Sequence, residues 1–338
     1  IAGGDLNGDG ILEIVAASMD GEIDVIDHQG KALPGFPIRL PPADWNLANK
    51  EHVISQGVIG SPVIVDLDND SKNDIIIVSL DGQVHVYKNN GQPMPGFPVR
   101  IQANGISAKL VSSPSLTDLN ADGYLDLIFG SNHVSDQSGY LFAINGRGSK
   151  AGNIYLQGFP VRIPMIRDRT LPTVGSGIPA SPVIGDIDGD GVPEIIVHGF
   201  VGKIYALGFD GKIKKSLDTT VGFNSGTADS NMLPAFAQPA LADLDGDGIA
   251  EVLTGGAGRR ALTNLLLAGV RFDYDHLLGA WSGVTGTMLG NFPQIMDDMQ
   301  IFNSPVATNI YGDSDPEVLM ASGGYYIRVF NKTGELKD

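Results

Sequence analysis

The stretch from Asp186 to Val197 decides the fold: Asp186-Ile187-Asp188-Gly189-Asp190-Gly191-Val192-Pro193-Glu194, followed by Ile195-Ile196-Val197. Carboxylates stand at positions 1, 3, 5 and 9 of this segment, and a glycine stands at position 6. Glycine tolerates positive φ, so the chain can turn sharply there and bring the acidic side chains together. The β-branched run that follows indicates a strand rather than a helix. The stretch therefore predicts an acidic loop between two strands.

The same pattern occurs six times along the chain. The copies, called loops 1 to 6 below, occupy residues 5–13, 66–74, 118–126, 186–194, 243–251 and 309–317. A Ser-Pro or Gln-Pro pair precedes most loops, and a short apolar run follows each of them. Next come an alternating segment, such as Gln83–Tyr87, and a Pro-Gly-Phe-Pro turn or a relative of it. A fixed phase of this kind is the signature of a repeat architecture.

Each repeat is predicted to contain four short strands joined by tight turns. We therefore expect an all-β fold, a β-propeller of six or seven four-stranded blades, with an acidic loop between strands 1 and 2 of the blades. The alternative, two or three separate β-sandwich domains, is disfavoured because the repeats keep phase without linkers. The predicted repeats of one domain, residues 1–338, are 1–57, 58–109, 110–177, 178–235, 236–302 and an incomplete 303–338.

The number of blades stays open at this point. The first repeat begins at its first strand, and the last stops after its third, near Phe330. Six blades lacking one outer strand, or seven blades with the remainder outside this segment, both fit. Because the chain opens without an initiator methionine, we expect it to be a segment of a longer product.

Composition excludes several classes of protein. The 338 residues include 39 acidic and 22 basic side chains, a formal net charge of -17, and no cysteine. Nucleic-acid binding needs clustered Lys and Arg, so it is not expected. Disulfide scaffolds and cysteine-ligated metal sites are excluded. The longest apolar runs, such as Ile75–Val78 and Leu265–Val270, are too short to form a transmembrane segment.

The acidic loops predict metal sites. Side-chain oxygens at positions 1, 3, 5 and 9, with the backbone carbonyl of position 7, form an oxygen cage that favours Ca²⁺. The alternative is a set of solvated acidic turns, but loops 1 to 5 hold 18 carboxylates, which would repel one another without cations. We expect about five structural Ca²⁺ ions and no catalytic role for them. Loop 6 is degraded, with Asn309 and Tyr311 at positions 1 and 3 and Asp315 as a partial substitute.

These repeats resemble the FG-GAP, or VCBS, repeat of the integrin α-chain propeller and of many bacterial surface proteins. In that family the loop between strands 1 and 2 binds Ca²⁺. The resemblance implies these ligands: Asp5, Asn7, Asp9 and Glu13; Asp66, Asp68, Asp70 and Asp74; Asp118, Asn120, Asp122 and Asp126; Asp186, Asp188, Asp190 and Glu194; Asp243, Asp245, Asp247 and Glu251; and the carbonyls of Ile11, Lys72, Tyr124, Val192 and Ile249.

Propeller topology also predicts where a partner binds. The blade-to-blade links and the strand 2–3 turns share one face, and these segments vary most in length here. Long loops on a rigid scaffold are common binding sites, and Arg and aromatic residues are good anchors. The candidate interface residues are Trp45, His52, His133, Arg167, Arg169, Arg259, Arg260 and Tyr274.

The leading functional interpretation is a non-enzymatic, calcium-stabilised recognition, adhesion or scaffold module. Its partner would be a protein, a glycan or another subunit of a surface assembly, and its location extracellular, on the cell surface or periplasmic. Millimolar extracellular Ca²⁺ saturates sites of modest affinity, whereas resting cytosol does not. Two alternatives stay open: a polysaccharide-active enzyme resembling the rhamnogalacturonan lyases, and a lectin.

Overall fold

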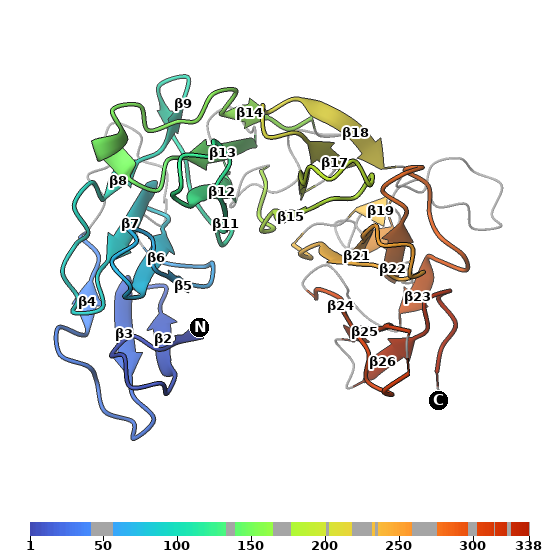
Figure 1. Ribbon diagram of the computed structural model, residues 1–338, viewed down its shortest axis with the longest axis horizontal. Helices are drawn as coiled ribbons and strands as arrows, with labels where there is room; N and C mark the ends of the chain where they lie inside the picture. The colour runs from blue at the N-terminus through green and yellow to red at the C-terminus, as the bar shows by residue number, and fades with distance from the viewer. Residues whose placement is uncertain are drawn as a thin grey trace, which may run out of the picture. The chain divides into compact units, whose positions relative to one another are not determined.

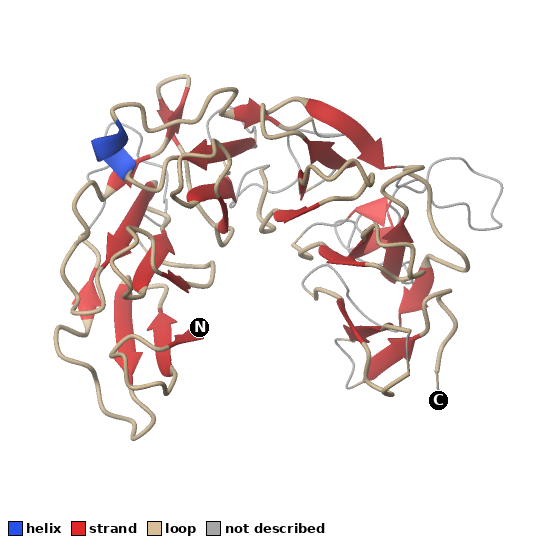
Figure 2. Ribbon diagram, in the orientation of Figure 1, coloured by secondary structure: helices blue, strands red, loops and turns tan. Residues whose placement is uncertain are grey.

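The computed structural model describes residues 1–41, 57–132, 139–164, 177–200, 203–217, 232–233, 236–258, 276–296, 303–313, 315–322 and 326–337. The fold is all-β (Figure 2): antiparallel strands dominate, and the helical element among these residues is the short 3₁₀ helix η1, Gly148–Ala151. The all-β prediction is confirmed. The chain divides into two compact units, one of Ile1–Arg162 with Leu171–Pro179 and one of Ile163–Thr170 with Ala180–Asp338.

The first unit contains three four-stranded antiparallel sheets in chain order (Figure 1). They are β1 (Ala2–Gly4), β2 (Glu13–Ala17), β3 (Glu22–Ile26) and β4 (Ile38–Arg39); β5 (Val63–Val65), β6 (Asp74–Val78), β7 (Gln83–Tyr87) and β8 (Val99–Arg100); and β11 (Ser115–Thr117), β12 (Asp126–Gly130), β13 (Tyr140–Ile144) and β14 (Val161–Arg162). A small hairpin of β9 (Gln102–Ala103) and β10 (Ile106–Ser107) follows the second sheet. Each sheet falls within one predicted repeat.

The second unit also contains three sheets. They are β15 (Val183–Gly185), β16 (Glu194–His198), β17 (Ile204–Leu207) and β18 (Ile213–Leu217); β19 (Met232–Leu233), β20 (Ala240–Ala242), β21 (Glu251–Gly258), β22 (His276–Trp281) and β23 (Gln294–Met296); and β24 (Val306–Thr308), β25 (Glu317–Ala321) and β26 (Ile327–Phe330). In the middle sheet β19 and β20 pair with different parts of the long strand β21. The last sheet has three strands and lies in the repeat predicted to be incomplete.

The hydrophobic core of each unit lies between successive sheets. In the first unit, Ile76 and Val84 of one sheet pack with Phe129 and Phe142 of the next. In the second unit, Ile196 packs in one cluster with Val252 and Trp281. All five residues of β6, β12 and β16 are buried, because both faces of each strand are covered. Burial of each large apolar side chain contributes about 1.5–3 kcal/mol, so the second strands anchor each repeat.

The Gly-Phe-Pro turns also recur structurally. Four Phe–Pro peptide bonds are cis, and they are Phe36–Pro37, Phe97–Pro98, Phe159–Pro160 and Phe292–Pro293. These turns join the third and fourth strands. They lie at the same end of the sheets as the acidic loops, since Asn89 of such a connection donates a hydrogen bond to the Leu6 carbonyl of loop 1, at 3.0 Å. Side chains from the strand 3–4 connections can therefore reach the acidic loops.

Candidate metal centres

The ninth residue of every acidic loop is the first residue of a second strand, and its carboxylate is buried. These residues are Glu13, Asp74, Asp126, Glu194, Glu251 and Glu317, which are 0–3% exposed. In all six loops one carboxylate oxygen accepts a hydrogen bond from the backbone N–H of the second loop residue, at 2.8–3.2 Å. The second carboxylate oxygen is left to face the loop, and a buried charge there needs a partner.

The side chains of the first, third and fifth residues hold the loop in shape, because their oxygens accept hydrogen bonds from backbone N–H groups of the same loop. In loop 1 both oxygens of Asp5 accept hydrogen bonds, from the N–H groups of Gly8 and Gly10, at 2.7 and 2.9 Å. Asn7 accepts from the N–H of Asp9, and Asp9 from that of Ile11. Loops 4 and 5 repeat this pattern. These hydrogen bonds bring the acidic side chains of each loop close together without a bound cation.

Positive φ at the fourth and sixth positions makes the turn possible. Gly8 and Gly10 have φ of 80° and 83°, and glycine also stands at both positions in loops 4 and 5. In loop 2 the same conformation is imposed on Asn69 (φ 62°) and Ser71 (φ 67°), and in loop 3 on Ala121 (φ 56°). An L-residue in this region is strained, so the loop geometry is held by its hydrogen bonds.

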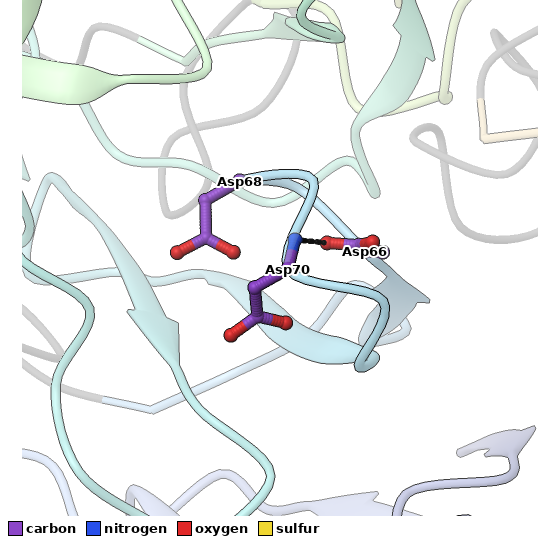
Figure 3. Close-up of side chains that lie close together, drawn as sticks. All are labelled: Asp66, Asp68 and Asp70. Carbon is purple, nitrogen blue, oxygen red and sulfur yellow. Dashed lines mark hydrogen bonds between the residues drawn. The ribbon is translucent and has the colours of Figure 1, made fainter.

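Three groups of carboxylates come close enough to share one cation, with one oxygen per residue within 4.8 Å of the others. They are Asp66, Asp68 and Asp70; Asp186, Asp188 and Glu194; and Asp243, Asp245 and Glu251. Figure 3 shows the first group: Asp68 and Asp70 present their carboxylates on one side of the loop, while Asp66 accepts the N–H of Asp70 at 3.0 Å. These oxygen-only donor sets fit a hard divalent cation.

Loop 5 is the clearest fit to a metal ion. Burial raises the pKa of the Glu251 carboxyl to about 7, the N–H of Leu244 opposes the shift, and the carboxylates of Asp245, Asp247 and Asp243 add to it. No basic side chain in the described ranges pairs with any of these four residues. A cation bound among them would relieve both the burial of charge and the mutual repulsion.

The ninth-position carboxylate of loop 3, Asp126, is also buried without full compensation of its charge. The Oδ1 atom of Asp126 is buried without a hydrogen-bond partner among the residues described. Burial raises the pKa of this carboxyl to about 6, and the nearby Asp122 and Asp118 add to the shift. The Arg147 guanidinium donates to Asp122 Oδ2 at 2.8 Å and lies 5.1 Å from the centre of the Tyr124 ring. Asp126 is therefore the member of this loop that most needs a cation.

Lysine side chains enter loops 2, 4 and 6, and the sequence analysis did not predict this. Lys88, Lys214 and Lys337 pair with the ninth-position carboxylates of loops 2, 4 and 6. Burial lowers the pKa of Lys88, but its contacts with Asp68, Asp70 and Asp74 outweigh this and leave the pKa raised. The spacing of 20 residues between Glu194 and Lys214, and again between Glu317 and Lys337, is a signal that the sequence contained.

The predicted backbone ligands stand next to the acidic side chains. The N–H groups of Ile11, Lys72, Tyr124, Val192 and Ile249 each donate to the fifth-position carboxylate of their loop, at 2.7–3.0 Å. Ligation by their carbonyl groups stays a prediction. The candidate partner residues Trp45, His52, His133, Arg167, Arg169, Arg259, Arg260 and Tyr274 all lie outside the described residues.

Two overlapping stretches, residues 66–129 and 118–197, match the FG-GAP-like repeat family. These repeats are FG-GAP-like. The match spans loops 2, 3 and 4 and confirms the resemblance drawn from the acidic spacing. No curated protein matches the sequence.

Solved structures share the fold at low sequence identity. The crystal structure of BBS1N in complex with ARL6DN has 14% identity and a TM-score of 0.55, covering 99% of this chain and 79% of that one. BamB from Moraxella catarrhalis has 11% identity and a TM-score of 0.54, covering 96% and 72%. Saccharomyces cerevisiae Sqt1 has 15% identity and a TM-score of 0.55, covering 97% and 69%. The all-β fold thus has propeller-like neighbours. Among the described residues, no helix has the length and apolar character needed to cross a bilayer.

Proposed function

We propose that this chain is a calcium-stabilised recognition or scaffold module, built as a β-propeller of six or seven blades, that acts without catalysis. The observation that carries the proposal is the fifth loop, where four carboxylates stand together without a basic partner in the described part of the chain. An arrangement of this kind is stable when a divalent cation completes it. Five loops with such oxygen donors favour Ca²⁺ over a softer metal.

The propeller proposal draws support from the first sheet. Ile14 of β2 is 51% exposed, whereas Ile75, the corresponding residue of β6, is fully buried. The first sheet covers Ile75, which packs in one cluster with Val15 and Val25. An apolar position of this kind fits the face of a sheet that another blade of a propeller would cover.

A binding role rests on the scaffold and on its relatives. BBS1N, a chain with this fold, was crystallised in complex with ARL6DN. We propose that a protein or glycan binds the face formed by the blade-to-blade links, through Trp45, His52, His133, Arg167, Arg169, Arg259, Arg260 and Tyr274. Millimolar Ca²⁺ is an extracellular condition, so the proposed location is secreted, cell-surface or periplasmic.

The non-enzymatic proposal is consistent with one feature of the described residues. His85 and Asp81 form a 2.8 Å pair of the kind that catalysis employs, but the two side chains are 3% and 0% exposed. A pair enclosed in this way cannot reach a polysaccharide. Release of unsaturated sugar from pectin-type substrates by the purified protein would contradict the proposal.

The calcium proposal is tested by thermal unfolding in Ca²⁺ and in EDTA. Each saturated site contributes about 1.4 kcal/mol at a tenfold excess of ion over Kd, so EDTA should lower Tm by several degrees. The double variant Asp245→Asn, Asp247→Asn should lose part of this difference. Asp210→Asn, in an ordinary exposed turn, is the matched control and should retain all of it. A Tm that is the same in Ca²⁺ and in EDTA would contradict the proposal.

A further inference from the structure

Lys88 occupies the centre of loop 2. Its ammonium nitrogen lies 2.7 Å from Asp68 Oδ1, 3.0 Å from Asp70 Oδ2 and 3.0 Å from Asp74 Oδ1. The Lys88 side chain is 18% exposed and Asp74 is fully buried. Three carboxylates from positions 3, 5 and 9 thus surround one ammonium group. These are the oxygens that a divalent ion in this loop would need.

Lys214 and Lys337 hold the corresponding place in loops 4 and 6. Their ammonium nitrogens lie 2.6 Å from Glu194 Oε1 and 2.6 Å from Glu317 Oε1, the inward oxygens of the ninth-position carboxylates. Lys214 also approaches Asp190 Oδ2 at 3.5 Å. In loop 6, which has lost its first and third carboxylates, the lysine is retained.

The two lysines stand where other repeats place an apolar residue. The N–H of Lys337 donates to the Val329 carbonyl, in the same register in which Leu33 and Met94 donate to the third strands of their own repeats. Lys214 and Lys337 each follow the ninth-position glutamate by 20 residues. The repeats that carry Lys at this position are also those without a cis Phe–Pro turn among the described residues.

Among the described residues, no lysine pairs with the ninth-position carboxylates of loops 1, 3 and 5. In the described part of the chain, the inward oxygen of Glu13 accepts a hydrogen bond from a neutral amide, Asn7 Nδ2, at 3.1 Å and has no basic partner. Among the described residues Asp126 pairs with no basic side chain, and Arg147 reaches Asp122 instead. Within the described ranges Glu251 pairs with no basic side chain, and its carboxylate accepts a hydrogen bond from the N–H of Leu244 at 2.8 Å.

We propose that the loops form two classes. In loops 2, 4 and 6 a lysine of the same repeat supplies the cation, and only loops 1, 3 and 5 take a free divalent ion. This assignment rests on the proposed calcium function and sharpens it, because loops 2 and 4 are removed from the set of expected ion sites.

The physical reason is competition between two cations for the same oxygens. A divalent ion in loop 2 would have to displace the Lys88 ammonium, since like charges repel at such short range. Lys88 is tethered beside the loop, so its effective concentration is high and independent of the medium. Loops 2, 4 and 6, which contain a lysine, would therefore stay ordered without Ca²⁺, whereas loops 1, 3 and 5 would not.

The test is native mass spectrometry of the full chain with Ca²⁺ as the probe, together with Tm measured in EDTA. The wild-type chain should bind one ion for each of loops 1, 3 and 5. Lys88→Met should bind one ion more, and its Tm in EDTA should fall by at least about 4 °C. Lys31→Met removes an exposed lysine of a strand 3–4 connection that makes no ion pair in the described structure, and it should match the wild type in both readings.

The outcomes separate this inference from the proposed function. Ion binding to all of loops 1 to 5 in the wild type, with no gain in Lys88→Met, would overturn the two-class assignment and leave calcium stabilisation standing. No bound Ca²⁺ would overturn the calcium function. In that case a lower Tm of Lys88→Met in EDTA, relative to Lys31→Met, would still support the lysine as an internal cation, and equal Tm values would overturn it.

Loop 4 provides a second measurement should Lys88→Met fail to fold. Lys214→Met is expected to gain one Ca²⁺ and to lose Tm in EDTA. Lys212→Met is its matched control, because Lys212 is 83% exposed and pairs with Asp210 outside the loop. Equal ion counts and equal Tm values for the two variants would contradict the proposal.

Discussion

The ninth residue of each acidic loop joins the loop to the core, and its partner decides how the loop responds to cations. One carboxylate oxygen accepts the second-position N–H in every loop, so the buried anion is fixed in place. The Lys337 ammonium nitrogen lies 2.6 Å from Glu317 Oε1, whereas Glu251 has no basic partner among the described residues. Neutralising the glutamate should therefore affect stability differently at Glu251 and at Glu317.

Glu251→Gln is expected to have opposite effects in EDTA and in Ca²⁺. The neutral amide removes an uncompensated buried charge, so the free energy of unfolding in EDTA should rise by about 1 kcal/mol. In Ca²⁺ it should fall by about 1–2 kcal/mol, because a metal ligand is lost. Glu317→Gln is the contrasting variant: it leaves Lys337 unpaired and should destabilise the protein in both buffers. Chemical denaturation in EDTA and in Ca²⁺ measures the free energy of unfolding of both variants. The same change in free energy for Glu251→Gln and Glu317→Gln in each buffer would contradict the prediction.

Ser71→Gly should stabilise the protein. Ser71 has φ of 67°, a conformation that glycine adopts without strain, and its N–H bond to Asp66 Oδ2 at 2.7 Å is kept. We expect a gain of about 0.5–1 kcal/mol in the free energy of unfolding. Lys72→Gly, at the adjacent residue whose φ is not positive, should lower it. A loss of stability in Ser71→Gly would show that the loop is not in this conformation.

At the scale of elements, the Gly-Phe-Pro turn of one repeat packs on the strand 3–4 connection of the next. A Cβ atom on Gly96 would lie 2.5 Å from the Arg147 carbonyl oxygen, and Gly96 has φ of 108°. The Ser149 N–H donates to the Gly96 carbonyl at 3.0 Å, so the two connections lie directly against each other. The repeats of the first unit are thus joined side by side through their backbones.

Gly96→Ala should cost about 3 kcal/mol or more, since it adds a backbone clash to the strain of positive φ. Gly105→Ala is the matched control, because Gly105 has φ of 75° and open space around its Cβ position. It should cost about 1 kcal/mol. Urea denaturation gives both values. Equal costs would mean that the two connections are not in contact.

The strand β16 ends in a buried titratable residue, His198. Its Nε2 lies 2.9 Å from the Ala237 carbonyl and its Nδ1 lies 3.1 Å from the Gly199 carbonyl. Burial lowers the pKa of His198 below its ordinary value of 6.5, and the two carbonyl groups oppose the shift only in part. The folded protein therefore keeps this imidazole neutral at pH values where the unfolded chain protonates it.

Stability should consequently fall as the pH drops below about 6.5, because the unfolded state then binds the proton more strongly. Above that pH the contribution of His198 is fully present. His198→Gln should flatten the decline between pH 7 and pH 5, and His28→Gln, at an exposed histidine, should not. Denaturation midpoints across this range measure the effect. An unchanged slope in His198→Gln would contradict the prediction.

At the scale of the whole molecule, periodic features were predictable from the sequence and pairings between distant positions were not. The acidic spacing and the β-branched runs predicted the loops and the second strands, because both depend on residues that are adjacent in the chain. The hydrogen bond from Leu244 to Glu251 and its five equivalents follow from that local turn. The single-domain boundaries and the ligand assignments stay predictions.

The lysines were missed for a physical reason. Lys88 and Lys337 enter the loops from the segments that follow the third strands, and Lys214 enters from β18. Their contact with the loops therefore depends on how a whole sheet is paired. A formal charge of -17 suggested that cations must come from solution, although the chain carries part of that charge compensation itself. Lys214 and Lys337 were recognisable only as polar residues at a position that is apolar in other repeats.

The most direct test of the central claim is the location of bound cations by anomalous X-ray diffraction from crystals grown in Ca²⁺. The calcium account predicts anomalous peaks within the acidic loops, above all among Asp243, Asp245 and Glu251 of loop 5. Peaks confined to loops 1, 3 and 5 would agree with the lysine assignment as well. Acidic loops that hold no calcium in such crystals would contradict the account.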